Sequence, residues 1–268
     1  MKCQNFYQSY KDFWGTLDVD NSNYEVVDNR IGVLKERTGD FIKLYNCLGD
    51  YRSKFVLQMM LSNWLRFDYA SIIHMKENNF TDYYDFDLLS CDENEVLVDV
   101  GAYTGDSALD YILCYGKYKK IYCYEITADS VLKLQENLRE YPDIDIRNKG
   151  VGDKNSVMYL DDKKDQSGNR ITDGNGETAV EVVRLDDDIS EEITLLKMDI
   201  EGSEISALKG AAGHIKSEKP KLLICVYHSN TDILEIPKLI QEMRGDYKFY
   251  LRSNGTCFGP AEIVLFAL

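Results

Sequence analysis

The chain has 268 residues, and its 31 Lys and Arg against 46 Asp and Glu give a formal net charge of −15. Apolar residues make up 44% of the sequence and charged residues 29%, which suits a folded chain with a sizeable core and excludes a disordered, collagen-like or coiled-coil protein. The acidic balance, with no dense basic run, disfavours nucleic acid or an anionic membrane surface as a partner and favours a small molecule or a glycan.

The N-terminal residues MKCQNFYQSYKDFW lack the apolar stretch of a signal peptide, and no run in the chain approaches the roughly 18 apolar residues of a membrane span. The seven Cys form no C-x-x-C pair, and most lie in or beside apolar runs, where a free thiol behaves as a small hydrophobic side chain. We therefore expect a cytoplasmic, reduced protein without membrane insertion.

Residues 1–90 have a helical and aromatic character. The run Ser53–Phe67 carries apolar side chains at three- and four-residue spacing, which predicts a helix with Ser53 as its N-cap. Asp40–Leu48 predicts a shorter helix that stops before Gly49, and Asn78–Asp87 is expected to be an irregular connector. We expect residues 1–90 to form a helical cap or an oligomerisation region, with a homo-oligomer as a candidate state.

Residues 91–268 change to short β-rich runs that alternate with amphipathic helices. Strand–helix alternation predicts a doubly wound, mostly parallel sheet with helices on both faces. The last two runs are separated by a loop too short for a crossover helix, so they are expected to pair as a C-terminal antiparallel hairpin. The predicted strands are Glu95–Val100, Lys120–Tyr124, Ile144–Val151, Thr194–Met198, Lys221–Tyr227, Lys248–Leu251 and Ile263–Ala267.

The first strand runs into a glycine-bearing turn, from Asp99 through Gly101 and Gly105 into a helix. Such glycines let the backbone approach a ligand, and the helix start offers unpaired N–H groups. The G-x-x-x-G spacing differs from the dinucleotide G-x-G-x-x-G, and bulky Tyr103 stands where a middle glycine would be, which suits a ligand without phosphate. Asp99 is expected to meet a cationic or amine-bearing group.

Glu125 ends the second strand, 20 residues after Gly105. A carboxylate at this place can accept both hydroxyls of a ribose, in nicotinamide and in other nucleoside cofactors alike. The spacing alone leaves these cofactors open.

Three acids follow the fourth strand: Asp199, Glu201 and Glu204. Asp199 and Glu201 are expected to point into the ligand crevice, whereas Glu204 falls in the first turn of a helix, where an acid is compatible with the helix dipole. Paired acids can also hold a metal, but with no clear third and fourth ligand we expect none. His228 follows the fifth strand and is the candidate general base, with Asp199 or Glu201 orienting it or the acceptor.

Four segments together resemble the FkbM family of S-adenosylmethionine-dependent methyltransferases: Asp99–Asp106, Leu185–Asp187, Lys197–Glu204 with Leu208–Ala211, and Tyr227–His228. The resemblance spans about residues 90–252. It implies a Rossmann-like class I methyltransferase fold, S-adenosylmethionine as cofactor, and O-methylation of a hydroxyl on a sugar, a glycan or a secondary metabolite.

The same resemblance implies roles for single residues. Glu125 would bind the ribose, and Asp199 would contact the cofactor as well as the acceptor. Ser167–Ile171 is similar to a Ser-Arg-Ile element of the family, interrupted by two residues, with Arg170 as a candidate substrate contact. The turn lining the methionine part would be Gly101, Ala102, Tyr103, Thr104 and Gly105, and the segment near the adenine would be Gly150, Val151, Gly152 and Asp153.

Two other functions compete with the methyltransferase. A nicotinamide-dependent oxidoreductase would use the same sheet and Glu125, but Tyr103, the missing third glycine and the C-terminal hairpin disfavour it. A non-catalytic, methyltransferase-like module would bind a partner through the aromatic N-terminal region.

Overall fold

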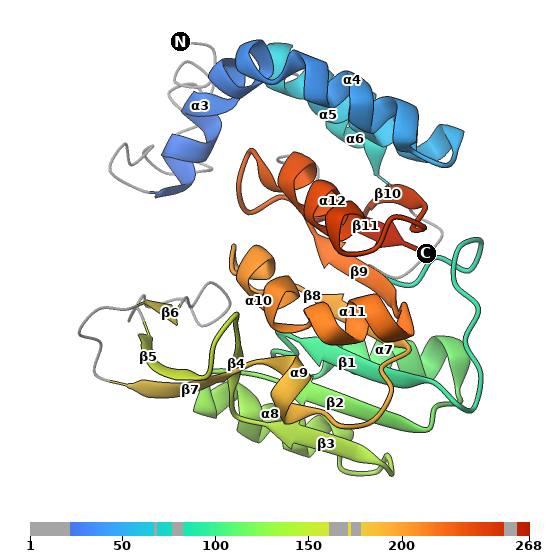
Figure 1. The fold of residues 1–268 in the computed structure, drawn as a ribbon, viewed down its shortest axis with the longest axis vertical. Coiled ribbons are helices and arrows are strands. Elements are labelled where there is room, and N and C mark those ends of the chain that lie inside the picture. The colour runs from blue at the N-terminus through green and yellow to red at the C-terminus, as the bar shows by residue number, and fades with distance from the viewer. Residues whose placement is uncertain (1–21, 67–68, 77–82, 161–170, 173–177, 255–261) are drawn as a thin grey trace.

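A computed structural model describes residues 22–66, 69–76, 83–160, 171–172, 178–254 and 262–268 of the chain. Its centre is a seven-stranded sheet in the order β10-β11-β9-β8-β1-β2-β3 (Figure 1). All neighbours pair in parallel except β11, which is antiparallel to β9 and to β10. The strands are β1 (Val96–Val100), β2 (Lys120–Tyr124), β3 (Ile144–Arg147), β8 (Leu195–Met198), β9 (Lys221–Cys225), β10 (Phe249–Ser253) and β11 (Ile263–Ala267).

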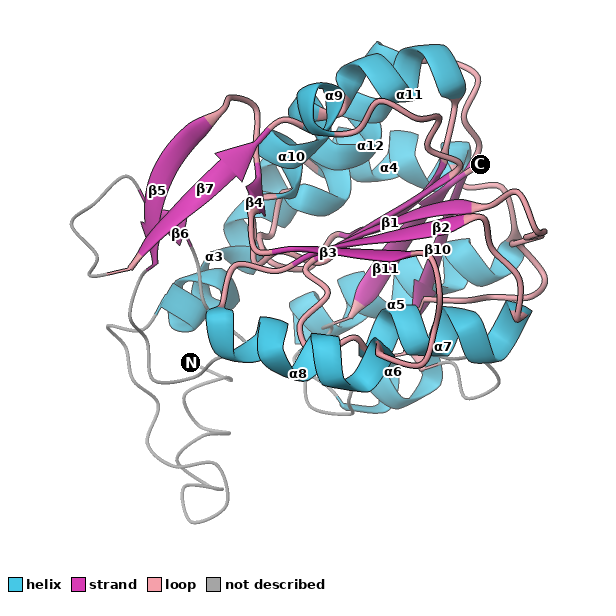
Figure 2. Cartoon of the chain, turned by 90° about the horizontal axis from the view of Figure 1, so that it is seen from below, coloured by secondary structure: helices cyan, strands magenta, loops and turns pink. Residues whose placement is uncertain are grey.

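Helices cover both faces of this sheet, as the strand–helix alternation predicted. The helices α7 (Asp106–Tyr115) and α8 (Ala128–Leu138) lie on one face, and α9 (Leu185–Asp188), α10 (Glu204–Gly210), α11 (Ala212–Glu218) and α12 (Asp232–Met243) lie on the other (Figure 2). Coverage on both faces explains why β1 and β8 are buried along their whole length. The doubly wound sheet and its antiparallel C-terminal hairpin are confirmed.

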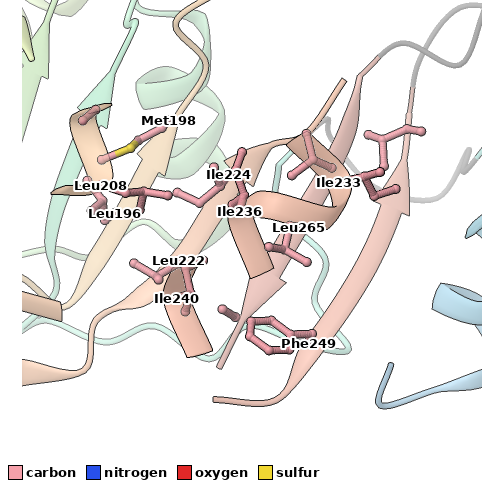
Figure 3. Close-up of a cluster of buried hydrophobic side chains, with 14 of the residues drawn as sticks. Leu196, Met198, Leu208, Leu222, Ile224, Ile233, Ile236, Ile240, Phe249 and Leu265 are labelled. Carbon is pink, nitrogen blue, oxygen red and sulfur yellow. The ribbon is translucent and has the colours of Figure 1, made fainter. Parts of the chain in front are cut away.

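The packing of α12 shows how the helical pattern builds this core. Ile233, Ile236 and Ile240 recur at three- and four-residue spacing and are at most 1% exposed. Figure 3 shows them in one cluster with Leu222 and Ile224 of β9. Burying such an isoleucine side chain contributes about 1.5–3 kcal/mol.

Two predicted elements are divided in the structure. The run Ile144–Val151 splits into β3 and β4 (Gly150–Val151), which belong to different sheets. The apolar stripe Ile205, Leu208, Ala212 and Ile215 predicts a helix packed on the sheet. The structure divides it between α10 and α11, which meet at Ala211, whose φ of −106° and ψ of 11° leave the helical range. The second sheet has the order β4-β7-β5-β6, with β5 (Ser156–Leu160), β6 (Ile171–Thr172) and β7 (Ala179–Val183). Its strands β5 and β7 are half exposed and lack the continuous apolar runs that revealed the central sheet.

The described N-terminal residues form α3 (Ser22–Glu36), α4 (Thr38–Cys47), α5 (Tyr51–Arg66) and α6 (Tyr69–Met75). Helix α5 begins two residues before the predicted N-cap Ser53, and Asp50 instead accepts the Ser53 N–H at 2.7 Å. The Ser53 hydroxyl accepts the backbone N–H of Leu251 in β10 at 2.9 Å. The helix thus covers the edge strand of the sheet, which would otherwise present unpaired backbone groups.

A buried arginine fastens this N-terminal part to the hairpin. Arg252 of β10 is 2% exposed and donates to Asp85, to Asp50 at 2.7 Å and to Ser53 at 3.1 Å. Burial by itself would raise the pKa of Asp50, but hydrogen bonds from Arg252 and Ser53 outweigh it and hold that pKa below its usual value.

We expect Asp50→Asn to lower the free energy of unfolding at neutral pH by about 1–2 kcal/mol, because Arg252 loses one charged acceptor and keeps Asp85. The folded pKa of Asp50 lies below its unfolded value of 3.8, so its contribution is present above that value and fades as pH falls through the folded pKa. Denaturant unfolding at neutral pH and at about pH 3 should show the difference shrinking.

Asp87→Asn is the matched control, because the Asp87 side chain is 73% exposed and pairs with Arg52 at the surface. It should change the free energy of unfolding by less than about 0.5 kcal/mol. Equal losses in the two variants, or an Asp50 effect independent of pH, would contradict the assigned network.

Candidate active site

A pocket of about 410 Å³ lies at the carboxyl ends of the parallel strands, where open α/β sheets bind ligands. Seven residues with a predicted role line it, namely Gly101, Tyr103, Glu125, Gly150, Val151, Asp199 and Glu201. Seven others do not: Asp99, Ala102, Thr104, Gly105, Gly152, Asp153 and His228. Residues that the sequence reasoning missed complete the walls, among them Tyr83, Asp106, Lys149, Lys197, Cys225, Tyr227 and Glu262.

Beneath the pocket, a buried ion pair joins β1 to β8. The Lys197 ammonium is 2.9 Å from the Asp99 carboxylate, and the two residues are 2% and 0% exposed. Lys197 also donates to the Gly101 carbonyl at 2.9 Å, and the Ser107 hydroxyl donates to Asp99 at 2.5 Å. Burial would lower the pKa of Lys197, but Asp99 and Asp199 outweigh it and raise that pKa, so the amine is charged. Asp99 therefore meets an amine, as predicted for a ligand, but the amine is that of Lys197.

The glycine turn after β1 is shaped by close packing. Gly101 has a φ of +80°, and a Cβ there would lie 1.9 Å from the backbone oxygen of Asp199. The N–H groups of Gly101 and Ala102 both donate to the Tyr124 carbonyl at 3.0 Å, which ties the turn to β2. Gly105, at a φ of +89°, faces Leu134 of α8, 2.7 Å from an added Cβ. The Thr104 carbonyl accepts a hydrogen bond from Asn137 of the same helix.

Glu125 lies between two backbone donors at the end of β2. One carboxylate oxygen accepts the Tyr103 N–H at 3.0 Å, and the other accepts the Thr127 N–H at 2.7 Å. Its burial, to 7% exposure, raises the pKa of Glu125, and the backbone hydrogen bonds oppose that rise. Each carboxylate oxygen has two lone pairs, so the fixed side chain keeps the capacity to accept further hydrogen bonds.

Asp199 lies among hydroxyl and imidazole groups at the other end of the pocket. The Tyr83 hydroxyl donates to it at 2.7 Å, the Tyr227 hydroxyl at 3.3 Å, and His228 Nε2 is 3.3 Å from Oδ1. Burial would raise the pKa of Asp199, but Lys197 and His228 outweigh it, so that pKa is lowered and Asp199 is a carboxylate. Tyr83 comes from the predicted connector Asn78–Asp87. The Tyr- and Asp-rich composition of that segment was the only feature of the sequence that could have indicated a site residue there.

His228 lies behind this wall among three carboxylates. Its Nδ1 is 2.9 Å from Glu204, and its Nε2 is 3.3 Å from Asp199 and 3.8 Å from Glu201. Burial would lower the pKa of His228, but the three carboxylates outweigh it and raise that pKa. The His228 side chain is 4% exposed and does not line the pocket. This position does not suit the general base that the sequence predicts, because a base has to reach the proton that it abstracts.

Glu204 and Glu201 have structural features that the sequence pattern did not reveal. Glu204, expected only to suit a helix dipole, is 1% exposed and accepts the Ile200 N–H at 2.9 Å while facing His228. Glu201 adopts a φ of +55°, a left-handed conformation that costs a non-glycine residue roughly 1–3 kcal/mol. The loop Ile200–Gly202 thus holds one acid against the pocket while another secures the loop from behind.

Of the four residues predicted near the adenine, Gly150–Asp153, the first two line the pocket. Gly150 and Val151 do so together with the preceding Lys149, whereas Gly152 and Asp153 do not. Gly152 packs under α10, since a Cβ on Gly210 would lie 1.9 Å from its carbonyl oxygen, and the Asp153 N–H donates to Ser206. The Ser167–Ile171 element, including Arg170, lies outside the described residues. The backbone of Ile171 is the exception.

The parallel strand order, the C-terminal hairpin and the pocket beside the glycine turn define a class I methyltransferase fold. Residues 99–249 match the methyltransferase FkbM domain family. That match covers more than half of the chain, and the chain belongs to the FkbM methyltransferase family. The predicted family resemblance is confirmed.

Among solved structures, methyltransferase FkbM from Methylobacillus flagellatus is similar, with 28% identity and a TM-score of 0.77 over 90% of this chain and 61% of that one. This chain therefore spans about 61% of the length of that relative. Residues 91–268 are about two thirds of the chain, so the match also includes much of the N-terminal helices.

Weaker matches include an rRNA methylase from Streptococcus thermophilus, at 13% identity and a TM-score of 0.44 over 66% of this chain and 87% of that one. Fibrillarin from Aeropyrum pernix, with natively bound S-adenosyl-L-methionine, matches at 11% identity and a TM-score of 0.42, over 66% and 67% of the two chains. Neither bears on what this chain binds. No curated protein matches the sequence.

Two further observations concern the compartment predicted from the sequence. No helix in the described part of the chain is long and apolar enough to cross a membrane. None of the described cysteines, Cys47, Cys91, Cys114, Cys123 and Cys225, forms a disulfide bond.

We expect Lys197→Met to lower the free energy of unfolding by about 3–5 kcal/mol, because it leaves the Asp99 carboxylate buried without a cation. The double variant Lys197→Met/Asp99→Asn should recover a substantial part of that loss, since no uncompensated charge is left. Denaturant unfolding of both variants checks this, and a double variant as unstable as the single one would speak against the ion pair as the cause.

Proposed function

We propose that the protein is an S-adenosylmethionine-dependent O-methyltransferase that acts on a hydroxyl of a sugar, a glycan or a secondary metabolite. The observation that supports this proposal most strongly is the position of Glu125. Two backbone N–H groups fix its carboxylate in the pocket, beside the turn that begins at Gly101. Its volume of about 410 Å³ falls in the range of small-molecule sites.

The charges of the pocket favour a cationic cofactor over a dinucleotide. Its described lining includes the carboxylates of Asp106, Glu125, Asp199, Glu201 and Glu262. The two lysines of the lining are already paired, Lys197 with Asp99 and Lys149 with Asp188 and Glu181. A pyrophosphate would meet net negative charge here, whereas a sulfonium and an amine are stabilised by it.

In the proposed arrangement, Glu125 accepts the ribose hydroxyls, and the backbone of Gly101 and Tyr103 lies along the methionine part. Lys149–Val151 would hold the adenine, which retains Gly150 and Val151 of the segment predicted from the sequence. Asp99, Ala102, Thr104 and Gly105 then act on the cofactor indirectly, by shaping the turn.

When bound, the sulfonium supplies the methyl group and takes the electron pair of the broken carbon–sulfur bond. The protein holds the acceptor hydroxyl in line with that bond, and such positioning can contribute roughly 7–11 kcal/mol of the barrier. Glu201 lines the pocket and is our candidate to accept the hydroxyl proton as the new oxygen–carbon bond forms. Asp199, held by Tyr83 and Tyr227, orients the acceptor, and His228 positions Asp199 and Glu201.

The lining near Asp199 also fits a hydroxylated acceptor. Tyr83, Tyr227, Glu201 and Glu262 offer hydroxyl and carboxyl groups, which exchange hydrogen bonds with alcohols. Since Tyr83 belongs to residues 1–90, we propose that this N-terminal part acts as a cap over the acceptor end. Its role as an oligomer contact stays a prediction.

Calorimetric titration with S-adenosylhomocysteine should show binding, and Glu125→Ala should weaken it at least about tenfold through loss of charged hydrogen bonds. Asp153→Ala is the control, because Asp153 does not line the pocket, and its affinity should match the wild type. A folded wild-type protein that does not bind S-adenosylhomocysteine would refute the proposed cofactor.

We expect Glu201→Gln to lower turnover by about 10²–10⁴ while S-adenosylhomocysteine affinity is kept, because the amide cannot take the proton. Methyl transfer to a panel of sugars and other alcohols is the measurement. Unchanged turnover would remove Glu201 as the base. Intact cofactor affinity with no transfer to any acceptor would favour the non-catalytic alternative.

A further inference from the structure

We propose that Asp199, Glu204 and His228 form a binding site for a divalent transition-metal ion. Each of them offers one ligand atom, and these atoms lie within 4.8 Å of one another. The ion's proposed role in methyl transfer rests on the proposed function, whereas its binding does not. The sequence reasoning expected no metal because Glu204, the third ligand, looked like an ordinary helix residue.

A second histidine of this chain shows what a purely structural environment looks like. His214 has one acceptor at each ring nitrogen, Glu218 at 2.8 Å from Nδ1 and the Ile189 carbonyl at 3.2 Å from Nε2. His228 instead has carboxylates near both nitrogens, and neither nitrogen makes a well-formed hydrogen bond.

The poor hydrogen bonding of the two His228 nitrogens is significant because the side chain is buried. The His228 side chain is 4% exposed, and Glu204, 1% exposed, has its Oε2 without a hydrogen-bond partner. A buried polar atom without a partner is destabilising and is uncommon in folded proteins, so these atoms need an explanation. A shared ion would bind one imidazole nitrogen and the carboxylate together.

The local charge points to a cation. Asp199 and Glu204 lie beside the imidazole, and Glu201 is 3.8 Å from its Nε2. The lysine near this group, Lys197, is already paired with Asp99. A divalent ion would offset the repulsion of these buried acids, which a single imidazolium offsets only in part.

The donor set indicates which ions fit. Two carboxylates and one imidazole suit Zn²⁺ or Mn²⁺ better than Mg²⁺ or Ca²⁺, which take mainly oxygen ligands. Asp199 also lines the pocket, so an ion on it would be within reach of the acceptor oxygen. There it would act as a Lewis acid that lowers the pKa of the acceptor hydroxyl, whose proton still passes to Glu201.

The test is calorimetric titration of the chelator-treated full chain with ZnCl₂ and with MnCl₂, without any methyl donor. We expect one site per chain, and we expect Glu204→Gln and His228→Gln each to weaken binding at least about tenfold. Asp106→Asn is the matched control, because Asp106 is a pocket-lining acid outside the cluster, and its affinity should equal that of the wild type.

A second measurement needs no variant. Crystals of the wild-type protein soaked in Zn²⁺ should give an anomalous peak between Asp199, Glu204 and His228. A peak at other residues only, no binding at millimolar ion, or equal affinity in folded Glu204→Gln and the wild type would overturn the site.

The two proposals fail separately. S-adenosylhomocysteine binding by a metal-free protein that takes up no Zn²⁺ or Mn²⁺ would overturn the metal site and leave the proposed cofactor in place. One bound ion in a protein without S-adenosylhomocysteine affinity would do the reverse.

Discussion

The buried ion pair between Lys197 and Asp99 is the constraint on which the site depends. Removing two charges from water is costly, and such a pair is tolerated only when its geometry and its remaining hydrogen bonds are good. Here Lys197 also donates to the Gly101 carbonyl, and Asp99 also accepts from Ser107. The pair therefore fastens the turn after β1 to the end of β8, and it places Gly101 directly against the backbone of Asp199.

Several strained or charged features of the pocket follow from this arrangement. Tyr103 and Glu201 both adopt positive φ values, 45° and 55°, on the two loops that the ion pair supports. Such conformations persist only where the surroundings hold them, and they gather at functional sites. Behind the Glu201 loop, Glu204 accepts the Ile200 N–H and faces His228, so the acids of this region are ordered as one group.

Parts of this architecture could be predicted from local patterns because they depend on local physics. Buried parallel strands are continuous apolar runs, and the turn glycines mark positive φ, so the sheet, its hairpin and the Gly101 turn were predictable. The second sheet could not be predicted in this way, since its strands β5 and β7 are half exposed. The link through Arg252 could not be predicted either, because its partners Asp50 and Asp85 are more than 160 residues away in sequence.

The sequence by itself determined the class I fold, the FkbM family and the positions of Glu125, Asp199 and Glu201 at strand ends. The tertiary structure decided what each polar group faces. It turned Asp99 toward Lys197, brought Tyr83 from the N-terminal part to Asp199, and enclosed His228 among three carboxylates. The physical reason is that burial and long-range neighbours set the charge and exposure of a titratable side chain, and neither is encoded by spacing along the chain.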